Sequence, residues 1–499
     1  MASIYKDATL QQVNEALEKS WRAFQDFRKK DLKERAAFLK AIANELGLVS
    51  IDLISVADRE THLGQPRLTT ELKRTIFQLN SYADACADGS WLDIRIDTAD
   101  AKRNPAKPDL RKMLVPLGPV VVFGASNFPF AYSTAGGDTA CALAAGCSVI
   151  LKAHPAHAET SELVAQAVQR AARKCNLAEG IFIHLHGASF EVGKALVQHP
   201  LTKAVGFTGS FEGGKALFDI ANQRKEPIPV FAEMGSVNPV FILPQQLKKD
   251  TAGIASMCAN SITQSAGQFC TNPGILVGIE DESLNIFEKL LGERIQKTEP
   301  VKMLHPGISK SFVQKREKIL TEEKVVVAAI TEFNFDQDES IPTLAEVSAP
   351  VFIENPLLHS EVFGPFSLLV KCQDANELTG VARAMEGQLT CSLMATEDEM
   401  KGNRELIEIL KDKCGRFVVN GVPTGVEVAL SMHHGGPYPA TTDSRYTSVG
   451  ADGIKRFARP ICFQNWSNEL LPAELKNENP LALWRTVNNE LTKKPVPTI

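Results

Sequence analysis

The hydrophobic pattern changes along the chain, and each change predicts a different kind of element. Over residues 9–86, stretches such as LQQVNEALEKSWRAFQDF and LKERAAFLKAIANEL carry apolar residues three and four positions apart, which predicts amphipathic helices. WLDIRIDTAD then alternates apolar and polar residues, RNPAKPD interrupts the pattern, and LRKMLVPLG resumes it, as in two extended segments joined by a turn. Such a ribbon either pairs with another chain or is an ordinary surface hairpin.

From residue 118, short apolar runs alternate with helical stretches. Five runs are predicted strands: PVVVFGAS (119–126), CSVILKA (147–153), IFIHLHG (181–187), AVGFTG (204–209) and IPVFAEMG (228–235). The helical stretches between them predict βαβ units and a parallel sheet covered on both faces, whose ligands bind beyond the carboxyl ends of the strands. A second α/β stretch runs from NPVFIL to FVVNG (417–421), and RFARPICFQNW predicts one more strand, followed by a helical tail.

Length and composition narrow the class of protein. For 499 residues we expect two or three domains, and a net charge of −5 without blocks of like charge gives no support for a nucleic-acid or membrane partner. The first residues lack a signal-peptide pattern, and no apolar run approaches the roughly 18 residues of a membrane span. The ten cysteines include no C-x-x-C pair, so we expect no metal site, no disulfide framework and a cytoplasmic protein with reduced thiols.

Two predicted strand ends carry residues suited to a phosphate or a ribose. VGFTGSFEGG (205–214) places Gly209 at the end of a strand and Gly214 one turn into a helix, where bare N–H groups can face a phosphate. VILKAHP places Lys152 at the end of another strand, within reach of a ribose hydroxyl or a phosphate. Taken singly, a tight turn and a solvated lysine explain these segments better.

Three further segments offer catalytic groups. AEMGS places Glu233 at a strand end, where burial would make it a general base, and GASNFPF places the amide of Asn127 where it can donate to an oxyanion. SAGQFCTNPG (265–274) presents Cys270 as a candidate nucleophile. Taken singly, these are also typical of a capping glutamate, an Asx turn before Pro129 and a small core residue.

Together, these residues form an ordered set: Asn127, Lys152, Gly209, Glu233 and Cys270. The set resembles the aldehyde dehydrogenase superfamily, and SEVFGPF (360–366) resembles that family's Glu-hydrophobe-Phe-Gly-Pro segment. The resemblance covers most of the chain and implies an α/β fold: a Rossmann-type parallel-sheet cofactor domain, an α/β catalytic domain and a small β oligomerisation element. The expected bounds are 1–90 and 113–232 for the dinucleotide-binding domain, 233–432 for the catalytic domain, and 91–112 and 450–499 for the bridging and oligomerisation segments. A homodimer or homotetramer is implied.

The resemblance also implies a role for each residue. Cys270, with a depressed pKa, would add to an aldehyde carbon, and the Asn127 side chain and the Cys270 backbone N–H would hold the oxyanion. Glu233 would activate the water that hydrolyses the thioester, or help to deprotonate the thiol. The implied cofactor contacts are Lys152, His154, Gly209, Ser210, Gly214, Glu361 and Phe363. Phe128 and Phe269 would line the aldehyde channel, although core packing explains them nearly as well.

Two departures from the family pattern bear on cofactor and substrate. Three residues after Lys152, where many NAD-using members carry an acidic residue, the chain has Pro155. Lys152 and His154 could then accept a 2′-phosphate, which favours NADP, with NAD still possible. GGPYPATTDSRYTSVG (435–450) replaces the usual Pro-Phe-Gly-Gly stretch and resembles the branch of 2,5-dioxovalerate (α-ketoglutarate semialdehyde) dehydrogenases, close to the NADP-dependent fatty aldehyde dehydrogenases.

The expected function is therefore oxidation of an aldehyde, foremost 2,5-dioxovalerate to 2-oxoglutarate. Medium- or long-chain aliphatic aldehydes and another ω-oxo acid are the alternatives. A keto acid needs a cation at the end of the channel, for which Arg445 is a candidate unless it is a structural arginine at a domain junction. Members that pass the acyl group to coenzyme A lack a base at the position of Glu233, so the sequence fits a non-acylating enzyme. A member kept only for structure or binding is expected to lose Cys270 or Glu233, and both are present.

Overall fold

The first domain is built around a five-stranded, wholly parallel sheet. The computed structural model describes residues 5–496, and in it the strand order is β5-β4-β3-β6-β7. The strands are β3 (Val120–Phe123), β4 (Val149–Lys152), β5 (Phe182–Leu185), β6 (Ala204–Thr208) and β7 (Val230–Glu233). Each of the five predicted runs contains one of them, and the predicted α/β class with a Rossmann-type parallel sheet is confirmed.

Helices cover both faces of this sheet because its strands are apolar on both sides. Val120 and Val122 pack on one face with helices α2–α6, while Val121 and Phe123 pack on the other with α1, α7 and α8. The helices are α1 (Leu10–Phe27), α2 (Leu32–Leu48), α3 (Ser50–Thr61), α4 (Gln65–Asp88), α5 (Gly137–Ala145), α6 (Ala158–Lys174), α7 (Phe190–Gln198) and α8 (Phe211–Asn222). The helices predicted over residues 9–86 are thus present, and capping boxes at Thr9 and Asp31 start the first two.

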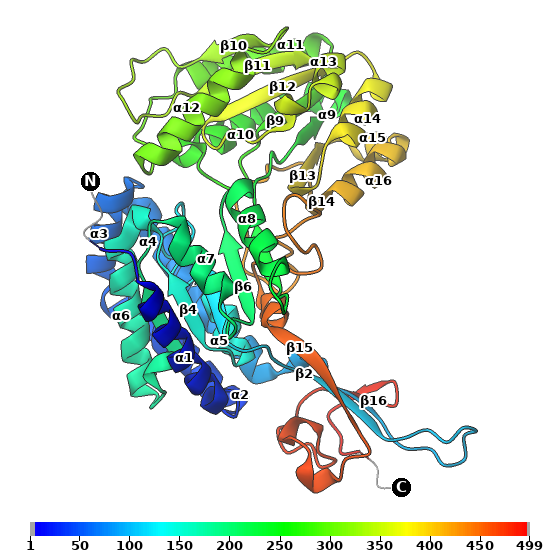
Figure 1. Cartoon of the computed structure of the whole chain (residues 1–499). Coiled ribbons are helices and arrows are strands. Elements are labelled where there is room, and N and C mark those ends of the chain that lie inside the picture. The colour runs from blue at the N-terminus through cyan, green and yellow to red at the C-terminus, as the bar shows by residue number, and fades with distance from the viewer. Residues whose placement is uncertain (1–4, 497–499) are drawn as a thin grey trace.

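A seven-stranded sheet organises the second domain, shown at the top of Figure 1. Its order is β10-β11-β12-β9-β8-β13-β14, and its strands are parallel except for the β10–β11 pair. The strands are β8 (Val240–Ile242), β9 (Ile275–Ile279), β10 (Val326–Ile330), β11 (Thr343–Ser348), β12 (Phe366–Cys372), β13 (Gln388–Met394) and β14 (Cys414–Val419). The helices are α9 (Pro244–Lys249), α10 (Thr251–Thr263), α11 (Glu282–Gln296), α12 (Pro306–Leu320), α13 (Ala349–Glu354), α14 (Ala375–Ala384), α15 (Glu397–Gly402) and α16 (Arg404–Lys413).

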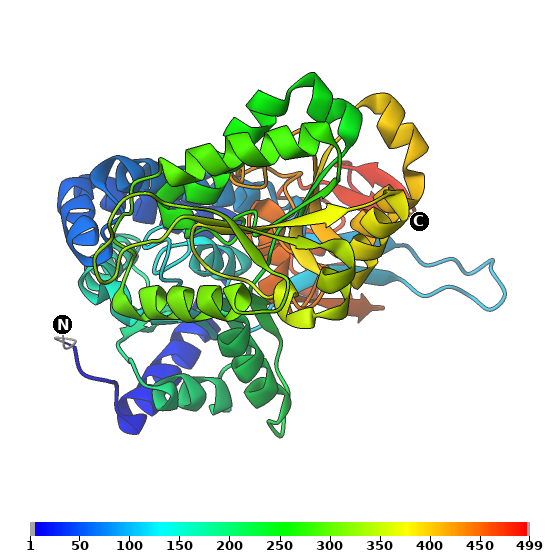
Figure 2. The ribbon, with the colours of Figure 1, turned by 90° about the horizontal axis from the view of Figure 1, so that it is seen from above.

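A third sheet, also of five strands, extends from the molecule. Its order is β15-β2-β1-β16-β17, from β1 (Arg95–Asp97), β2 (Leu110–Pro116), β15 (Ala458–Gln464), β16 (Arg485–Val487) and β17 (Glu490–Thr492). Figures 1 and 2 both show the loop between β1 and β2 reaching away from the other two sheets. Among residues 5–496, no helix combines the length and apolar character of a bilayer-spanning segment.

The prediction of a helical tail was wrong. Residues 465–496 contain only short 3₁₀ turns and the strands β16 and β17. Asn465, Asn479 and Asn488 adopt the left-handed conformation, which ends regular helix, and Pro472 and Pro480 interrupt the remaining stretches.

Candidate active site

A cavity of about 440 Å³ lies where the carboxyl ends of β3, β4, β6 and β7 face the second domain. Ten predicted site residues line it: Asn127, Phe128, Lys152, His154, Gly209, Ser210, Glu233, Cys270, Glu361 and Phe363. Residues more than 200 positions apart in the sequence therefore meet in one space. Such a cleft beyond the carboxyl ends of parallel strands is where α/β sheets bind their ligands.

The loop that carries Cys270 is held by backbone contacts. After α10, residues 265–267 adopt left-handed conformations, with φ of 51°, 56° and 62°. Gly267 packs so closely on Gly364 that a Cβ at Gly267 would lie 2.4 Å from the Gly364 carbonyl, so only glycine fits there. The Asn238 side chain donates to the Cys270 carbonyl at 2.8 Å, which fixes the nucleophile from the other side.

The electrostatic surroundings keep Cys270 protonated, contrary to the expectation of a depressed pKa. Burial raises the pKa of the Cys270 thiol well above its usual value, and the negative charge of Glu233 raises it further. The expected depression fails because the buried sulfur shares its pocket with this carboxylate. Cys270 therefore needs a neighbouring base to become a nucleophile.

His434 and Ser448 complete this group, and the sequence analysis missed both. His434 Nε2 lies 3.6 Å from Cys270 Sγ and 3.1 Å from Glu233 Oε1, while the Ser448 hydroxyl donates to Glu233 Oε2 at 2.6 Å. Burial raises the pKa of Glu233, but His434 and the hydrogen bonds from His434 and Ser448 lower it by more. The lowered pKa keeps Glu233 ionised beside the Cys270 thiol, so the carboxylate can accept the thiol proton.

Asn127 and three aromatic rings surround the approach to Cys270. The buried Asn127 amide donates to the Gln268 carbonyl at 3.2 Å, which leaves its second N–H for an oxyanion. Phe128 lies edge-on to Phe269 and to Tyr132, with ring centroids 5.5 Å and 5.2 Å apart. Phe269 is thus part of this aromatic wall, although it does not line the main cavity.

The other end of the cavity has the groups that a dinucleotide needs. Burial raises the pKa of the Glu361 carboxyl to about 7. A Cβ at Gly235 would lie 2.7 Å from Glu361 Oε2, so the missing side chain of Gly235 leaves the space that this carboxylate occupies. Ser210 caps the N-terminus of α8, and its hydroxyl accepts from the Gly213 N–H at 3.2 Å. Gly209 directly precedes this cap. These residues fit NAD(P): α8 would face the pyrophosphate and Glu361 a ribose.

Lys152, His154 and Gly214 differ in how far they match their predicted roles. Lys152 lines the cavity, and burial lowers its pKa while Asp7 raises it. Burial lowers the pKa of His154 well below its usual value, so it is neutral at pH 7 and offers a 2′-phosphate no charge. Gly214 does not reach the cavity: a Cβ there would lie 2.6 Å from Met234 Cγ, so this glycine serves the packing of α8 on β7.

Arg445 is not brought to the site. Its side chain is 78% exposed and forms a two-pronged ion pair with Asp443. A cation for an acidic substrate must therefore come from elsewhere in the chain.

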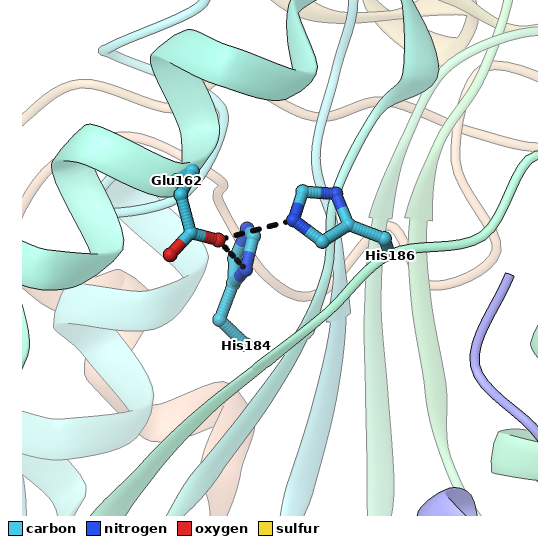
Figure 3. A group of neighbouring side chains, drawn as sticks. All are labelled: Glu162, His184 and His186. Atoms are coloured by element: carbon cyan, nitrogen blue, oxygen red, sulfur yellow. Dashed lines mark hydrogen bonds and ion pairs between the residues drawn. The ribbon is translucent and has the colours of Figure 1, made fainter. Parts of the chain in front are cut away.

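Two groups of side chains in residues 5–496 have donor atoms close enough to hold a metal ion. One is the catalytic group just described. In the other, at the end of β5, Glu162 Oε2 lies 3.2 Å from His184 Nδ1 and 3.0 Å from His186 Nε2 (Figure 3). Tyr5 stacks on His186 with centroids 4.0 Å apart, so this group holds the N-terminal segment to the sheet with no ion required. The expectation of no metal stays a prediction.

Residues 2–456 match the Aldehyde dehydrogenase family. The chain belongs to the aldehyde dehydrogenase family. This aldehyde dehydrogenase is 45% identical to alpha-ketoglutaric semialdehyde dehydrogenase 2 of Azospirillum brasilense, over 97% of this chain and 92% of the relative. It is 42% identical to an alpha-ketoglutaric semialdehyde dehydrogenase of Acinetobacter baylyi, over 98% and 93%.

Solved structures show the same fold. A succinic semialdehyde dehydrogenase from Streptococcus pyogenes in complex with NADP+ superposes with a TM-score of 0.76 at 17% identity, over 92% of this chain and 96% of the other. A 1-pyrroline-5-carboxylate dehydrogenase gives 0.78 at 19% identity, over 92% and 86%. This aldehyde dehydrogenase is thus an oxidoreductase that oxidises an aldehyde with NAD(P).

Proposed function

We propose that this enzyme is a non-acylating dehydrogenase that oxidises 2,5-dioxovalerate to 2-oxoglutarate. The two relatives that match nearly the whole chain carry the name of this activity. The observation that supports hydrolysis over acyl transfer is the buried group of Cys270, Glu233 and His434, which sets two bases beside the nucleophile.

In the proposed reaction, the thiol proton of Cys270 passes to one of two nearby bases, Glu233 Oε1 or His434 Nε2. The thiolate adds to the aldehyde carbon, and the free N–H of the Asn127 amide donates to the oxyanion, an interaction typically worth about 10²–10³ in rate. When bound, NAD(P) accepts the hydride that leaves this carbon. Once the first proton has left to solvent, Glu233 takes a proton from the water that attacks the thioester and returns it to the departing Cys270 thiolate, while the carboxylic acid product loses its own proton to solvent.

NADP is the proposed cofactor, with NAD as a possible second one. Lys152 would face the adenosine ribose and its 2′-phosphate, and Pro155 brings no carboxylate to this position. The neutral His154 would contribute shape and a hydrogen bond. Glu361 would hold the nicotinamide ribose, Phe363 would support the ring, and Ser210 with Gly209 would face the pyrophosphate.

A homodimer or homotetramer and a cytoplasmic location are also part of the proposal. The edge strand β15, which pairs with β2 on one side only, supports pairing between subunits, because an exposed edge readily accepts another strand. All ten cysteines are free thiols, which fits a reducing compartment.

The test follows the absorbance of reduced nicotinamide with purified enzyme, offering 2,5-dioxovalerate and a long-chain aliphatic aldehyde, each with NADP and with NAD. We expect the highest kcat/KM for 2,5-dioxovalerate with NADP, no requirement for coenzyme A, and loss of turnover in Cys270→Ala with cofactor binding retained. A higher kcat/KM for the aliphatic aldehyde would overturn the substrate in favour of a fatty aldehyde. Turnover by Cys270→Ala would refute the nucleophile, and an inactive wild type that still binds cofactor would indicate a binding protein.

A further inference from the structure

Three partly buried arginines surround the aromatic wall beside Cys270. Arg67 and Arg74 come from α4 and Arg416 from β14. In the part of the chain that the structure describes, none of the three forms an ion pair with a carboxylate (the ion pairs found there involve other residues). A half-buried guanidinium without an acidic partner is costly to desolvate, so such a cluster indicates an anion that binds from solution.

Arg74 and Arg416 meet at one short loop. Arg74 Nη2 donates to the Val426 carbonyl at 3.0 Å, and Arg416 donates to the carbonyls of Gly425, at 2.7 Å, and Pro423. Two cations from distant parts of the sequence therefore lie on the same four residues, 423–426. Arg416 Nε is buried without a hydrogen-bond partner, so this guanidinium still has a donor to offer.

Arg74 contacts the aromatic wall beside the reactive end of the site. The Arg74 guanidinium lies 5.5 Å from the centre of the Tyr132 ring, and Tyr132 packs on Phe128. The positive charge of Arg74 lowers the pKa of the Cys270 thiol, against the larger effects of burial and Glu233. Cys270 in turn acts on Arg416. Arg74 and Arg416 thus both act electrostatically on the Cys270 sulfur.

Arg67 belongs to the wall. Its guanidinium stacks 5.0 Å from the centres of both Phe128 and Phe269, and its Nη2 donates to the Asn127 carbonyl at 2.7 Å. The carboxyl nearest in sequence, Glu71, is occupied by two backbone N–H groups, and burial raises its pKa. Its charge acts on Arg67 and Arg74 without forming a direct ion pair with either.

We infer that Arg74 and Arg416 form the subsite for the carboxylate of the substrate, with Arg67 and the aromatic wall fixing the path between that carboxylate and Cys270. The inference rests on the proposed function, because it makes the substrate an aldehyde with an anionic far end. Two guanidinium groups provide the planar paired donors that carboxylates bind best, and an uncharged alkyl chain would leave them unsatisfied.

The experiment compares 2,5-dioxovalerate with pentanal, which has five carbons and no charge, in wild type, Arg74→Gln, Arg416→Gln and Arg416→Lys. Arg445→Gln serves as the matched control, because that arginine is exposed and paired with Asp443. We expect KM for 2,5-dioxovalerate to rise about 10- to 100-fold in each glutamine variant, with a much smaller change for pentanal. Arg416→Lys should recover part of the loss, and the control should behave as wild type.

An equal loss for both substrates would overturn the inference and assign the arginines to loop stability. Unchanged KM for the keto acid would also overturn it. Calorimetric binding of 2-oxoglutarate to the same proteins separates this failure from failure of the proposed function. If wild type oxidises neither aldehyde but binds 2-oxoglutarate and the glutamine variants do not, the subsite stands and the proposed reaction falls. Equal binding by wild type and variants refutes the subsite itself.

Discussion

Replacing Glu361 with glutamine should stabilise the cofactor-free enzyme at pH 8.5 and do so far less near pH 5. Burial raises the pKa of this carboxyl from 4.5 to about 7. As pH rises from 4.5 to 7, the unfolded chain loses this proton while the folded chain keeps it. Stability therefore falls through this window, and the cost is fully present above pH 7. Glutamine has no proton to lose, so it avoids the cost.

The two pKa values set the size of the effect. A difference of about 2.5 corresponds to about 3.4 kcal/mol at 1.36 kcal/mol per unit, and contact of the side chain with an open cavity reduces this to about 2 kcal/mol. An unfolding entropy of about 2.1 cal/mol/K per residue gives about 1 kcal/mol/K for the chain, so Tm should rise by about 2 °C. If the domains melt separately, the rise would be about 5 °C.

The assay is thermal melting of cofactor-free wild type, Glu361→Gln and the exposed control Glu354→Gln at several pH values between 5 and 8.5. Cofactor KM, measured in parallel, should rise about 10-fold in Glu361→Gln, because a ribose hydroxyl loses a charged acceptor. Equal stabilisation at pH 5 and 8.5, or destabilisation at pH 8.5, would refute the reasoning. The buried Glu361 carboxylate would then not destabilise the cofactor-free enzyme.

Three more predictions follow from contacts that the sequence did not reveal. His434→Gln should lower kcat about 100-fold or more while cofactor binding persists, as steady-state kinetics and calorimetry would show; near-normal kcat would exclude His434 from proton transfer. Asp7→Asn removes a negative charge that acts on Lys152, so the NADP/NAD ratio of kcat/KM should rise about threefold at low salt and less at high salt; a falling ratio would contradict this. A hydrogen bond from His184 lowers the pKa of Glu162 to about 2, so the half-buried carboxylate stabilises the fold above pH 4.5 and loses this effect as pH falls towards 2. Glu162→Gln should cost about 1 kcal/mol in urea unfolding at pH 7, and a cost that persists undiminished below pH 4 would argue against the ion pair.

The sequence predicted the parts of the site whose signal is local. The residues at the ends of β3, β4, β6 and β7 were found because a strand pattern followed by a polar residue is visible in one short stretch. His434 was missed because only the fold brings this loop residue to Cys270. Arg74 and Arg416 were missed because only the fold sets a helix and an edge strand against the loop 423–426. The one local signal for His434 was the pair of histidines before Gly435, and the sequence pattern assigned no function to this pair.

Other errors have equally physical origins. Gly214 fits a phosphate loop by its spacing, yet the space beside it is filled by Met234, which no local pattern records. Arg445 carries the right charge, but Asp443, two residues earlier, already holds it at the surface. The pKa of Cys270 depends on burial and on Glu233 across the cleft, so its direction follows only from the assembled site.

The contact between Gly267 and Gly364 has a consequence for how this enzyme can diverge. The nucleophile loop and the segment that carries Glu361 touch backbone to backbone, and Asn272 also donates to the Gly364 carbonyl at 2.8 Å. A mutation that moves one segment must move the other, so lineages have little freedom at this end of the cleft. Among residues 5–496, no glycine packs in this way against Lys152 or Pro155 at the adenosine end. Coenzyme preference can therefore drift between descendants while the reacting centre stays fixed.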